Sequence, residues 1–153
     1  MTRPEGIRQG DIPGVQLRCR RELPVRCEEA WRWLTEQDLL RRWLGEAEAE
    51  AGDRGRLSIG AWGGREGPPA AGRTREFTPP TRWVLTFGEA SWTAATDLEI
   101  ELIPRPGGCE VSVLQRGFER LPLSTCLTVW EAYRRRWRAA LDRLAATAGR
   151  PPV

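Results

Sequence analysis

The sequence of 153 residues contains no histidine, no lysine and no asparagine, so all 24 of its basic residues are arginine. Without histidine, the chain cannot build a Ser-His-Asp or Cys-His catalytic set, an HExxH zinc site or an imidazole general base. Without lysine, it has no amine for a Schiff base and no P-loop lysine for nucleotide phosphates. Any catalysis must therefore use Asp, Glu, Tyr, Cys or Ser, with arginine only as a fixed cation.

Cysteine is scarce, and its four positions favour free thiols. Cys19, Cys27, Cys109 and Cys126 form no CxxC pair, and a zinc site without histidine would need all four to converge. Residues 1–13 have the composition of a flexible leader and lack the apolar stretch of a signal peptide. No apolar run approaches the roughly 20 residues of a membrane span. We therefore expect a cytoplasmic protein with reduced cysteines, no membrane span, no metal and no cofactor.

The charge balance is mildly basic, with a formal net charge of +3. The densest basic cluster consists of Arg134, Arg135, Arg136 and Arg138. No groove-reading motif accompanies this cluster, so we interpret it as a solvated helix face paired with Glu131 and Asp142. The composition therefore predicts no nucleic-acid partner.

Alternation of apolar and polar residues predicts an antiparallel sheet. The first strand carries Val15, Leu17 and Cys19 and ends at Pro24. Further strands are expected at 46–51, 55–61, 73–78, 81–88, 97–103 and 109–117, with turns at 79–80 and 106–108 and a loop over 60–72. The alternating Glu46, Glu48 and Glu50 are interpreted as one solvated strand face, not as a glycosidase pair.

Three helices are expected as well. The first covers 27–34, and Thr35 with Asp38 predicts a capping box for a second short helix that stops at Gly45. A long helix begins at Ser124 or at Thr128, where Glu131 would complete a second capping box, and ends at Ala148. Its predicted apolar stripe is Leu127, Trp130, Trp137, Leu141 and Leu144. This order predicts an α+β fold, a single domain over residues 14–149 followed by a tail at 150–153.

Several local phrases resemble one known superfamily. They are EEAWRWLTEQDLLRRWL at 28–44, PPTRWVLTF at 79–87 and LEIELIPRPGGCEVSVLQRGF at 98–118, together with Trp137, Leu141 and Leu144. Over residues 15–148 the chain resembles the SRPBCC (START-like) superfamily, most closely the group named after the activator of the heat-shock-protein ATPase. The resemblance implies a helix-grip fold: a curved antiparallel sheet of six or seven strands wraps the C-terminal helix, and two short helices follow strand one.

The resemblance also implies an apolar cavity between the sheet and the last helix. The chain departs from the family at Cys109, where threonine is usual, and near Gln115, where a histidine is common, so it implies no imidazole-dependent reaction. The candidate ligand-binding residues are Trp43, Trp62, Trp83, Trp92, Gln115, Trp130, Tyr133, Arg134 and Trp137. Each tryptophan buries roughly 150–250 Å², so the tryptophans form core, pocket wall or interface.

Arg134 has two interpretations: a structural or solvated cation, or a fixed cation that binds a ligand carboxylate, phenolate or enolate with help from Gln115. The leading hypothesis is a non-catalytic protein that holds a small lipophilic or aromatic ligand. One alternative is a polyketide cyclase/aromatase-like or hydrolase-like enzyme using Arg134, Tyr133 and an acid. Another is a co-chaperone or other protein-interaction domain. A homodimer through a strand edge or exposed tryptophan stays open.

Overall fold

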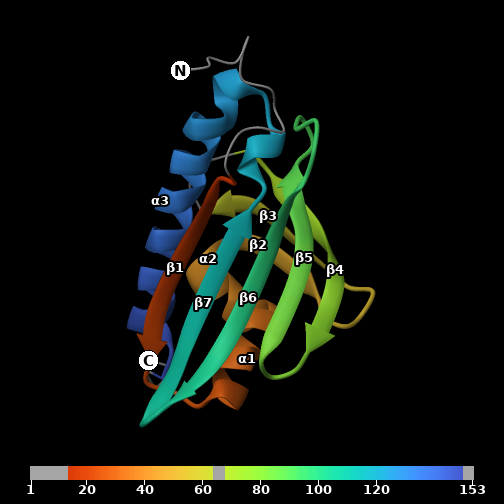
Figure 1. Cartoon of the computed structure of the whole chain (residues 1–153). Helices are drawn as coiled ribbons and strands as arrows, with labels where there is room; N and C mark the ends of the chain where they lie inside the picture. The colour runs from red at the N-terminus through yellow and green to blue at the C-terminus, as the bar shows by residue number, and fades with distance from the viewer. Residues whose placement is uncertain (1–13, 64–67, 150–153) are drawn as a thin grey trace.

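Seven antiparallel strands form one sheet in the order β1-β7-β6-β5-β4-β3-β2, curled around a long helix (Figure 1). The computed structural model describes residues 14–63 and 68–149. The elements are β1 (Gln16–Leu23), α1 (Cys27–Thr35), α2 (Gln37–Leu44), β2 (Gly45–Glu50), β3 (Arg56–Trp62), β4 (Ala70–Thr78), β5 (Arg82–Glu89), β6 (Thr96–Arg105), β7 (Gly108–Arg116), a short 3-10 helix (Phe118–Arg120) and α3 (Leu123–Thr147).

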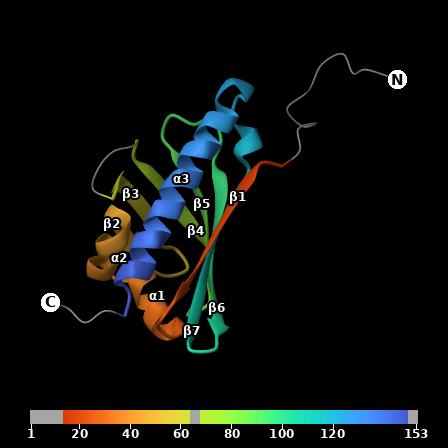
Figure 2. The same cartoon turned by 90° about the vertical axis from the view of Figure 1, so that its left-hand side faces the viewer.

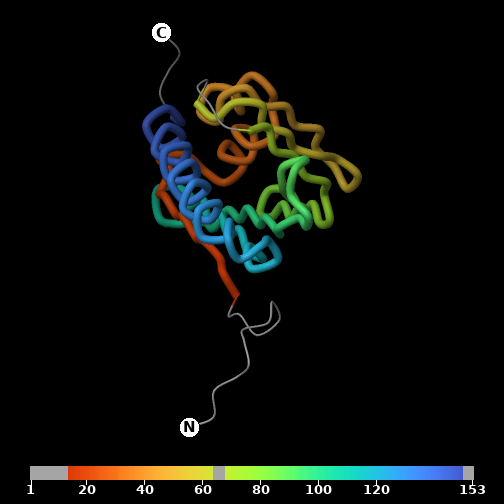
Figure 3. Tube along the Cα trace, turned by 90° about the horizontal axis from the view of Figure 1, so that it is seen from above, coloured from red at the N-terminus to blue at the C-terminus, as the bar shows by residue number. Residues whose placement is uncertain are grey.

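The helices all lie on one side of the sheet. Figure 2 shows α3 alongside β1, with α1 and α2 between α3 and the far strands. Seen from above in Figure 3, the strands follow an open arc from β1, beside α3, round to β2 and β3. The helix-grip fold and the α+β class are confirmed. We call the face of the sheet toward α3 the inner face and the opposite face the outer face.

The predicted alternation places the core correctly. In β5, Trp83, Leu85 and Phe87 point inward and are fully buried, and in β7 Val111 and Val113 do the same. The predicted leader at 1–13, the tail at 150–153 and part of the predicted loop, 64–67, lie outside the described residues. The domain bounds of 14–149 stay a prediction.

The apolar stripe of α3 differs from the prediction at one position. Leu127 is 65% exposed, whereas Cys126, Tyr133 and Trp137 are buried. At 100° per residue, position 126 lies about 20° from the direction of Trp137, but position 127 lies about 80° away. Including Leu127 in the stripe was therefore wrong.

Both predicted capping boxes are also wrong. The hydroxyl of Thr35 donates to the carbonyl of Trp31 at 2.9 Å, inside α1, so α2 begins without a side-chain cap. The helix α3 begins at Leu123, one residue before the Ser124 alternative, so Thr128 lies inside it and Glu131 pairs with Arg134 instead. A capping sequence is a local signal, and here backbone and charged partners nearby replace it.

A β-bulge sets the direction of Trp62. Glu46 pairs with Ala61 and Ala47 pairs with Ile59, so Gly60 is the extra residue in β3. One extra residue changes which side chains of a strand share a face. As a result, Trp62 points to the inner face, where it is 5% exposed.

Side chains of α2 cover the free edge of β2. The amide of Gln37 donates to the carbonyl of Ala47 at 2.6 Å and accepts from the backbone N–H of Ala49 at 3.2 Å. The guanidinium of Arg41 donates to the same carbonyl at 3.1 Å. These contacts satisfy edge groups that would otherwise pair with another strand. In the part of the chain that the structure describes, no helix is both long and apolar enough to cross a membrane.

Candidate ligand-binding site

Three of the predicted site residues, Trp62, Tyr133 and Trp137, meet on the inner face, in what we call the buried aromatic cluster. It consists of Trp62, Phe87, Phe118, Tyr133 and Trp137. The Trp62 ring lies edge-on to Trp137 at 4.8 Å and to Tyr133 at 5.9 Å between centroids. Trp92, from the loop between β5 and β6, packs against Tyr133 at 5.3 Å. These rings fill space between the sheet and α3.

The predicted polar residue Gln115 is fully engaged by the protein. Its carbonyl oxygen accepts from Trp137 Nε1 at 2.8 Å, and its amide donates to Thr96 Oγ1 at 2.9 Å. The Thr96 hydroxyl donates in turn to the Phe87 carbonyl at 2.6 Å. All three side chains are buried, so this chain of hydrogen bonds holds the core in one arrangement.

Two further predicted residues lie away from the buried aromatic cluster. Trp43 is 1% exposed and donates from Nε1 to the carbonyl of Trp33, joining α2 to α1. Trp83 is fully buried, donates to Thr74 Oγ1 at 2.7 Å and packs edge-on against Phe77. Both indoles therefore have protein partners for their polar and apolar parts.

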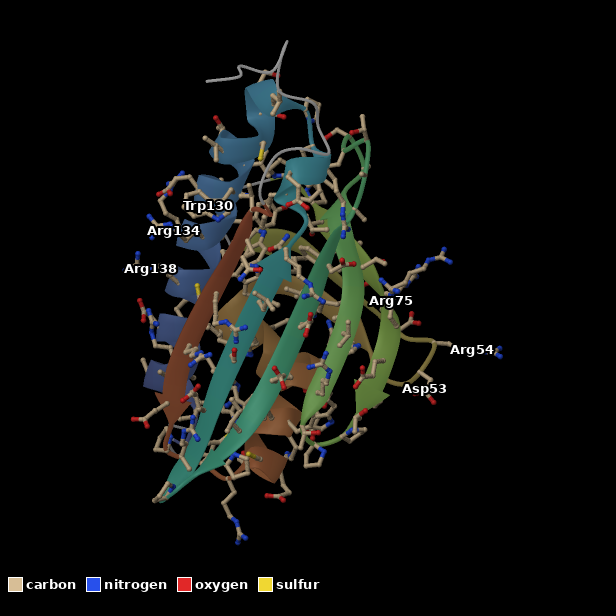
Figure 4. The ribbon with its side chains drawn as sticks, in the orientation of Figure 1. Asp53, Arg54, Arg75, Trp130, Arg134 and Arg138 are labelled. Carbon is tan, nitrogen blue, oxygen red and sulfur yellow. The ribbon has the colours of Figure 1, made fainter. Side chains whose placement is uncertain are left out.

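The last two, Trp130 and Arg134, project outward from α3 together with Arg138 (Figure 4). Arg134 lies over the Trp130 ring at 5.4 Å and forms an ion pair with Glu131 at 2.9 Å. The hydrogen bond from Arg134 lowers the pKa of the Glu131 carboxyl. Trp130 Nε1 donates to the carbonyl of Gln16 on β1. Arg134 thus has a carboxylate partner on its own helix and solvent beside it.

A polar cluster that the sequence analysis missed adjoins Tyr133. The Tyr133 hydroxyl donates to Glu89 Oε2 at 2.6 Å, and Arg136 lies 4.0 Å from the same oxygen and 5.0 Å from the Tyr133 ring centroid. Burial, followed by the adjacent Glu89, raises the pKa of Tyr133, so its hydroxyl stays protonated. Glu89 continues the inward alternation of Trp83, Leu85 and Phe87, and that signal could have revealed it.

A cleft of about 990 Å³ opens over β2, β3, β4 and the end of β5. Strand register places Glu48, Ser58, Ala71 and Gly88 opposite one another on successive strands of the outer face. The neighbouring row of the inner face, Ala47, Ile59, Ala70 and Glu89, borders the cleft as well. Its other lining residues are Arg41, Gly45, Glu46, Gly60, Pro69, Ala90, Trp92, Thr93, Ala94 and Ala95. Its floor is hollow because these strands carry small side chains.

Trp92 connects this cleft to the buried aromatic cluster. Gly88 makes room for its ring, since a Cβ at Gly88 would lie 2.8 Å from a Trp92 ring carbon. Of the predicted site residues, Trp92 is the one that lines the cleft. Three carboxylates, Glu46, Glu48 and Glu89, and one guanidinium, Arg41, border it within the described part of the chain. Arg41 lies 3.9 Å from Glu48, so the lining is acidic on balance.

The described segments, 14–63 and 68–149, bring together no group of three Cys, Asp or Glu side chains that could hold a metal ion. The candidate site consists of the cleft, the aromatic wall at Trp92 and the carboxylates that border it.

The fold and sequence together define the class of protein. Residues 24–149 match the family described as Activator of Hsp90 ATPase homolog 1-like protein, and the chain belongs to this family, of the SRPBCC type. No protein with curated function matches the chain.

Three solved structures illustrate the fold. Protein MLL2253 from Mesorhizobium loti has a TM-score of 0.76 and 17% identity, over 91% of this chain and 100% of that one. An Hsp90 activator from Plasmodium falciparum has a TM-score of 0.69 and 19% sequence identity, over 89% of this chain and 97% of that one. DynU16, from the dynemicin biosynthetic locus, has a TM-score of 0.71 and 16% sequence identity, over 89% of this chain and 48% of that one. At these identities the likeness is one of fold.

Proposed function

We propose that this protein binds a small, flat, mainly apolar molecule in the cleft over β2–β5 and that it does so without catalysing a reaction. The observation that carries the proposal is a cleft of about 990 Å³ with Trp92 in its wall and a floor of alanine, glycine and serine. Ligand pockets typically measure about 300–1,000 Å³ and combine apolar surface with a few polar groups. Trp92 offers a stacking surface that is held from behind by Tyr133.

The charges of the lining point to the ligand's polar group. Glu46, Glu48 and Glu89 line the cleft with one guanidinium, Arg41, and Arg136 lies 4.0 Å from Glu89. Three carboxylates against two guanidinium groups favour a positive charge or a hydrogen-bond donor over an anion. Glu89 is the best placed anchor, since its side chain is 10% exposed and Tyr133 holds one of its oxygens. An aromatic cation would add a cation–π contact with Trp92. The expected ligand is therefore a planar molecule that bears an amine or another hydrogen-bond donor.

The test is direct titration with proflavine, a planar aromatic cation, followed by its fluorescence anisotropy, with anionic anilinonaphthalene sulfonate as the comparison probe. We expect proflavine to bind more tightly than the anion. Trp92→Ala and Glu89→Gln should each weaken proflavine binding by about 5–30-fold, the equivalent of roughly 1–2 kcal/mol. Native mass spectrometry of freshly purified protein would reveal a natural ligand.

Matched controls come from α3. Trp130→Ala and Glu131→Gln remove the same side-chain types outside the cleft and should leave proflavine affinity within about twofold. Equal losses in the control and cleft variants, or preference for the anionic probe, would overturn the proposal. So would affinity that is unchanged in Trp92→Ala.

A second candidate function rests on the convergence of Tyr133, Glu89 and Arg136, which supplies the acid, tyrosine and arginine of a cyclase-like or hydrolase-like enzyme, with Arg136 in place of Arg134. The raised pKa of Tyr133 makes its hydroxyl a donor to Glu89 and not a base at neutral pH. Hydrolysis of p-nitrophenyl acetate that disappears in Glu89→Gln would favour this enzyme over the binding protein.

The family to which the chain belongs supplies the third candidate, a co-chaperone. In that case the purified chain should bind an Hsp90-type chaperone and stimulate its ATPase, a result that proflavine binding would not predict. Failure in both assays removes this candidate.

A further inference from the structure

Two of the four cysteines, Cys27 and Cys109, lie in contact. They belong to the start of α1 and the start of β7, and Figure 1 shows both of these ends at the same end of the molecule. Cys27 is the first residue of α1 and Cys109 is the second residue of β7. Their Sγ atoms are 3.0 Å apart, and the residues are 7% and 1% exposed. Both are free thiols. Cys19, in β1, and Cys126, in α3, belong to other elements.

We propose that Cys27 and Cys109 form a modification site that reacts with a low-molecular-weight disulfide, such as glutathione disulfide, to give an intramolecular disulfide. A disulfide bond is about 2.05 Å long, so the two sulfurs need to approach by only about 1 Å. Because the first turn of α1 and the start of β7 carry them, a small shift of α1 supplies this approach. The site is independent of the ligand cleft, which neither cysteine lines.

A small pocket adjoins Cys109, which is itself only 1% exposed. This pocket, of about 290 Å³, is lined by Leu23, Pro24, the turn residues 105–108 and Cys109 itself. Cys109 is therefore the thiol that reacts first, and Cys27, which contacts its sulfur, resolves the mixed disulfide.

The reaction is a two-step exchange that balances without any other oxidant. Cys109 loses its proton to solvent and attacks one sulfur of glutathione disulfide, which releases one glutathione thiolate. Cys27 then loses its proton and attacks the Cys109 sulfur of the mixed disulfide, which releases the second glutathione. The two protein thiols are oxidised, and glutathione disulfide is reduced to two thiols.

Burial raises the pKa of Cys109 to about 12, with the neighbouring Cys27 adding to the shift. Since only the thiolate attacks, the exchange should be slow at pH 7 and faster at pH 9. The resulting bond would close a loop spanning 82 positions, from α1 to β7. Closing a loop of this length restricts the unfolded chain and should raise the melting temperature by roughly 5–15 °C.

The experiment uses the full chain, incubated folded with glutathione disulfide at pH 9, alkylated under denaturing conditions and digested with trypsin without reduction. We expect a linked pair of peptides, 27–32 with 83–116, which contain Cys27 and Cys109. Dithiothreitol should release the pair and reverse the gain in melting temperature.

Cysteine variants complete the test. Cys27→Ala should stop the reaction at the mixed disulfide, and Cys109→Ala should abolish both steps, whereas Cys19→Ala and Cys126→Ala should still give the linked peptides. Persistence of four alkylatable thiols in the wild type, a link through Cys19 or Cys126, or a mixed disulfide that never closes would each overturn the proposal.

Discussion

Across β1, β7, β6 and β5 the outer face of the sheet carries long charged side chains in pairs, whereas across β4, β3 and β2 it carries alanine, glycine and serine at the cleft. Glu99 is 7% exposed because Arg82 and Arg116 each approach one of its oxygens to 2.8 Å. Asp97 is held in the same way by Arg120 at 2.8 Å. Among the described residues that line the cleft, the one such pair on the outer face is Arg41 with Glu48, at 3.9 Å and largely exposed.

The same contrast continues on the inner face. The indole N–H of Trp137 donates to Gln115 of β7, but the buried indole N–H of Trp62, from β3, has no hydrogen-bond partner among the described residues. A region whose polar groups and volume are already used gains little from a ligand. The β2–β4 half leaves both space and polar groups unused, and this difference favours it as the binding half.

The largest expected effect is where β4 pairs with β5, the boundary between the β2–β4 half of the sheet and the half made of β5, β6, β7 and β1. In β4, Gly72 lies so close to β5 that a Cβ there would overlap the carbonyl oxygen of Thr86. Gly72→Val should lower the free energy of unfolding by at least about 3 kcal/mol, because backbone atoms cannot move aside cheaply. Urea denaturation of the wild type and the variant measures this difference in the free energy of unfolding.

The control for this variant is the neighbouring Ala71→Val, which points into the cleft. It should change stability by less than about 0.5 kcal/mol while weakening proflavine binding. If both variants unfold equally, the outer face of β4 is packed and the two halves do not differ.

The half of the sheet made of β1, β7, β6 and β5, which we call the paired half because its outer face carries ion pairs, should be sensitive to loss of a carboxylate. Glu99→Ala leaves Arg82 and Arg116 without their shared partner and should destabilise the protein by about 1–2 kcal/mol, a value reduced because both arginines reach solvent. Glu48→Ala, at the cleft, should cost almost nothing, since its side chain is 75% exposed. Comparable losses in the two variants, measured by thermal denaturation, would remove the contrast.

Alkaline pH should also act on the paired half, because Cys109 lies in β7 and the strands β2–β4 contain no cysteine. The folded-state pKa of Cys109 is raised to about 12 from 9.0, so the unfolded chain releases this proton first. The contribution of Cys109 to stability should therefore be complete below pH 9 and fall between pH 9 and 12 by at most ~1.4 kcal/mol per pH unit.

This prediction is checked by urea titrations at several pH values on the reduced protein. Cys109→Ala should make the profile less steep in that window, with the remaining slope due to the raised pKa values of Tyr133, Cys19 and Cys126, whereas Ala71→Val should leave the slope unchanged. A wild-type profile that stays level to pH 11 would contradict the raised pKa.

The smallest expected effect concerns the two indoles. Trp137→Phe and Trp62→Phe remove similar volumes, but only the first breaks a hydrogen bond and leaves Gln115 Oε1 buried without a donor. Trp137→Phe should therefore cost about 1 kcal/mol more than Trp62→Phe. An equal loss of unfolding free energy would mean that the Trp62 N–H is satisfied as well.

Much of the fold follows from local pattern. The strand expected at 97–103 is Thr96–Arg105, and the one expected at 109–117 is Gly108–Arg116, because alternation records which side of a strand is buried. The inward position of Gln115 was predicted from the same alternation. The predicted capping boxes failed, since helix starts depend on competing partners that residue spacing does not reveal.

The candidate site was less predictable, because its residues come together only through pairing and packing. Tyr133 and Glu89 are 44 positions apart, and nothing in their local sequence links them. Trp62 points inward only because Gly60 bulges where β3 meets β2. Arg134 and Arg136 look alike in sequence, but helical rotation directs one to Glu131 and the other to Glu89.

The sequence by itself determined the class of fold, the buried face of strands such as β5, β6 and β7 and the absence of imidazole and lysine chemistry, since these depend on composition and short-range periodicity. Tertiary structure alone decided where the molecule is hollow. Strand register aligned Glu48, Ser58, Ala71 and Gly88 across four strands. A cleft is a property of side chains that are distant in sequence and adjacent in space, and no periodicity along the chain encodes that adjacency.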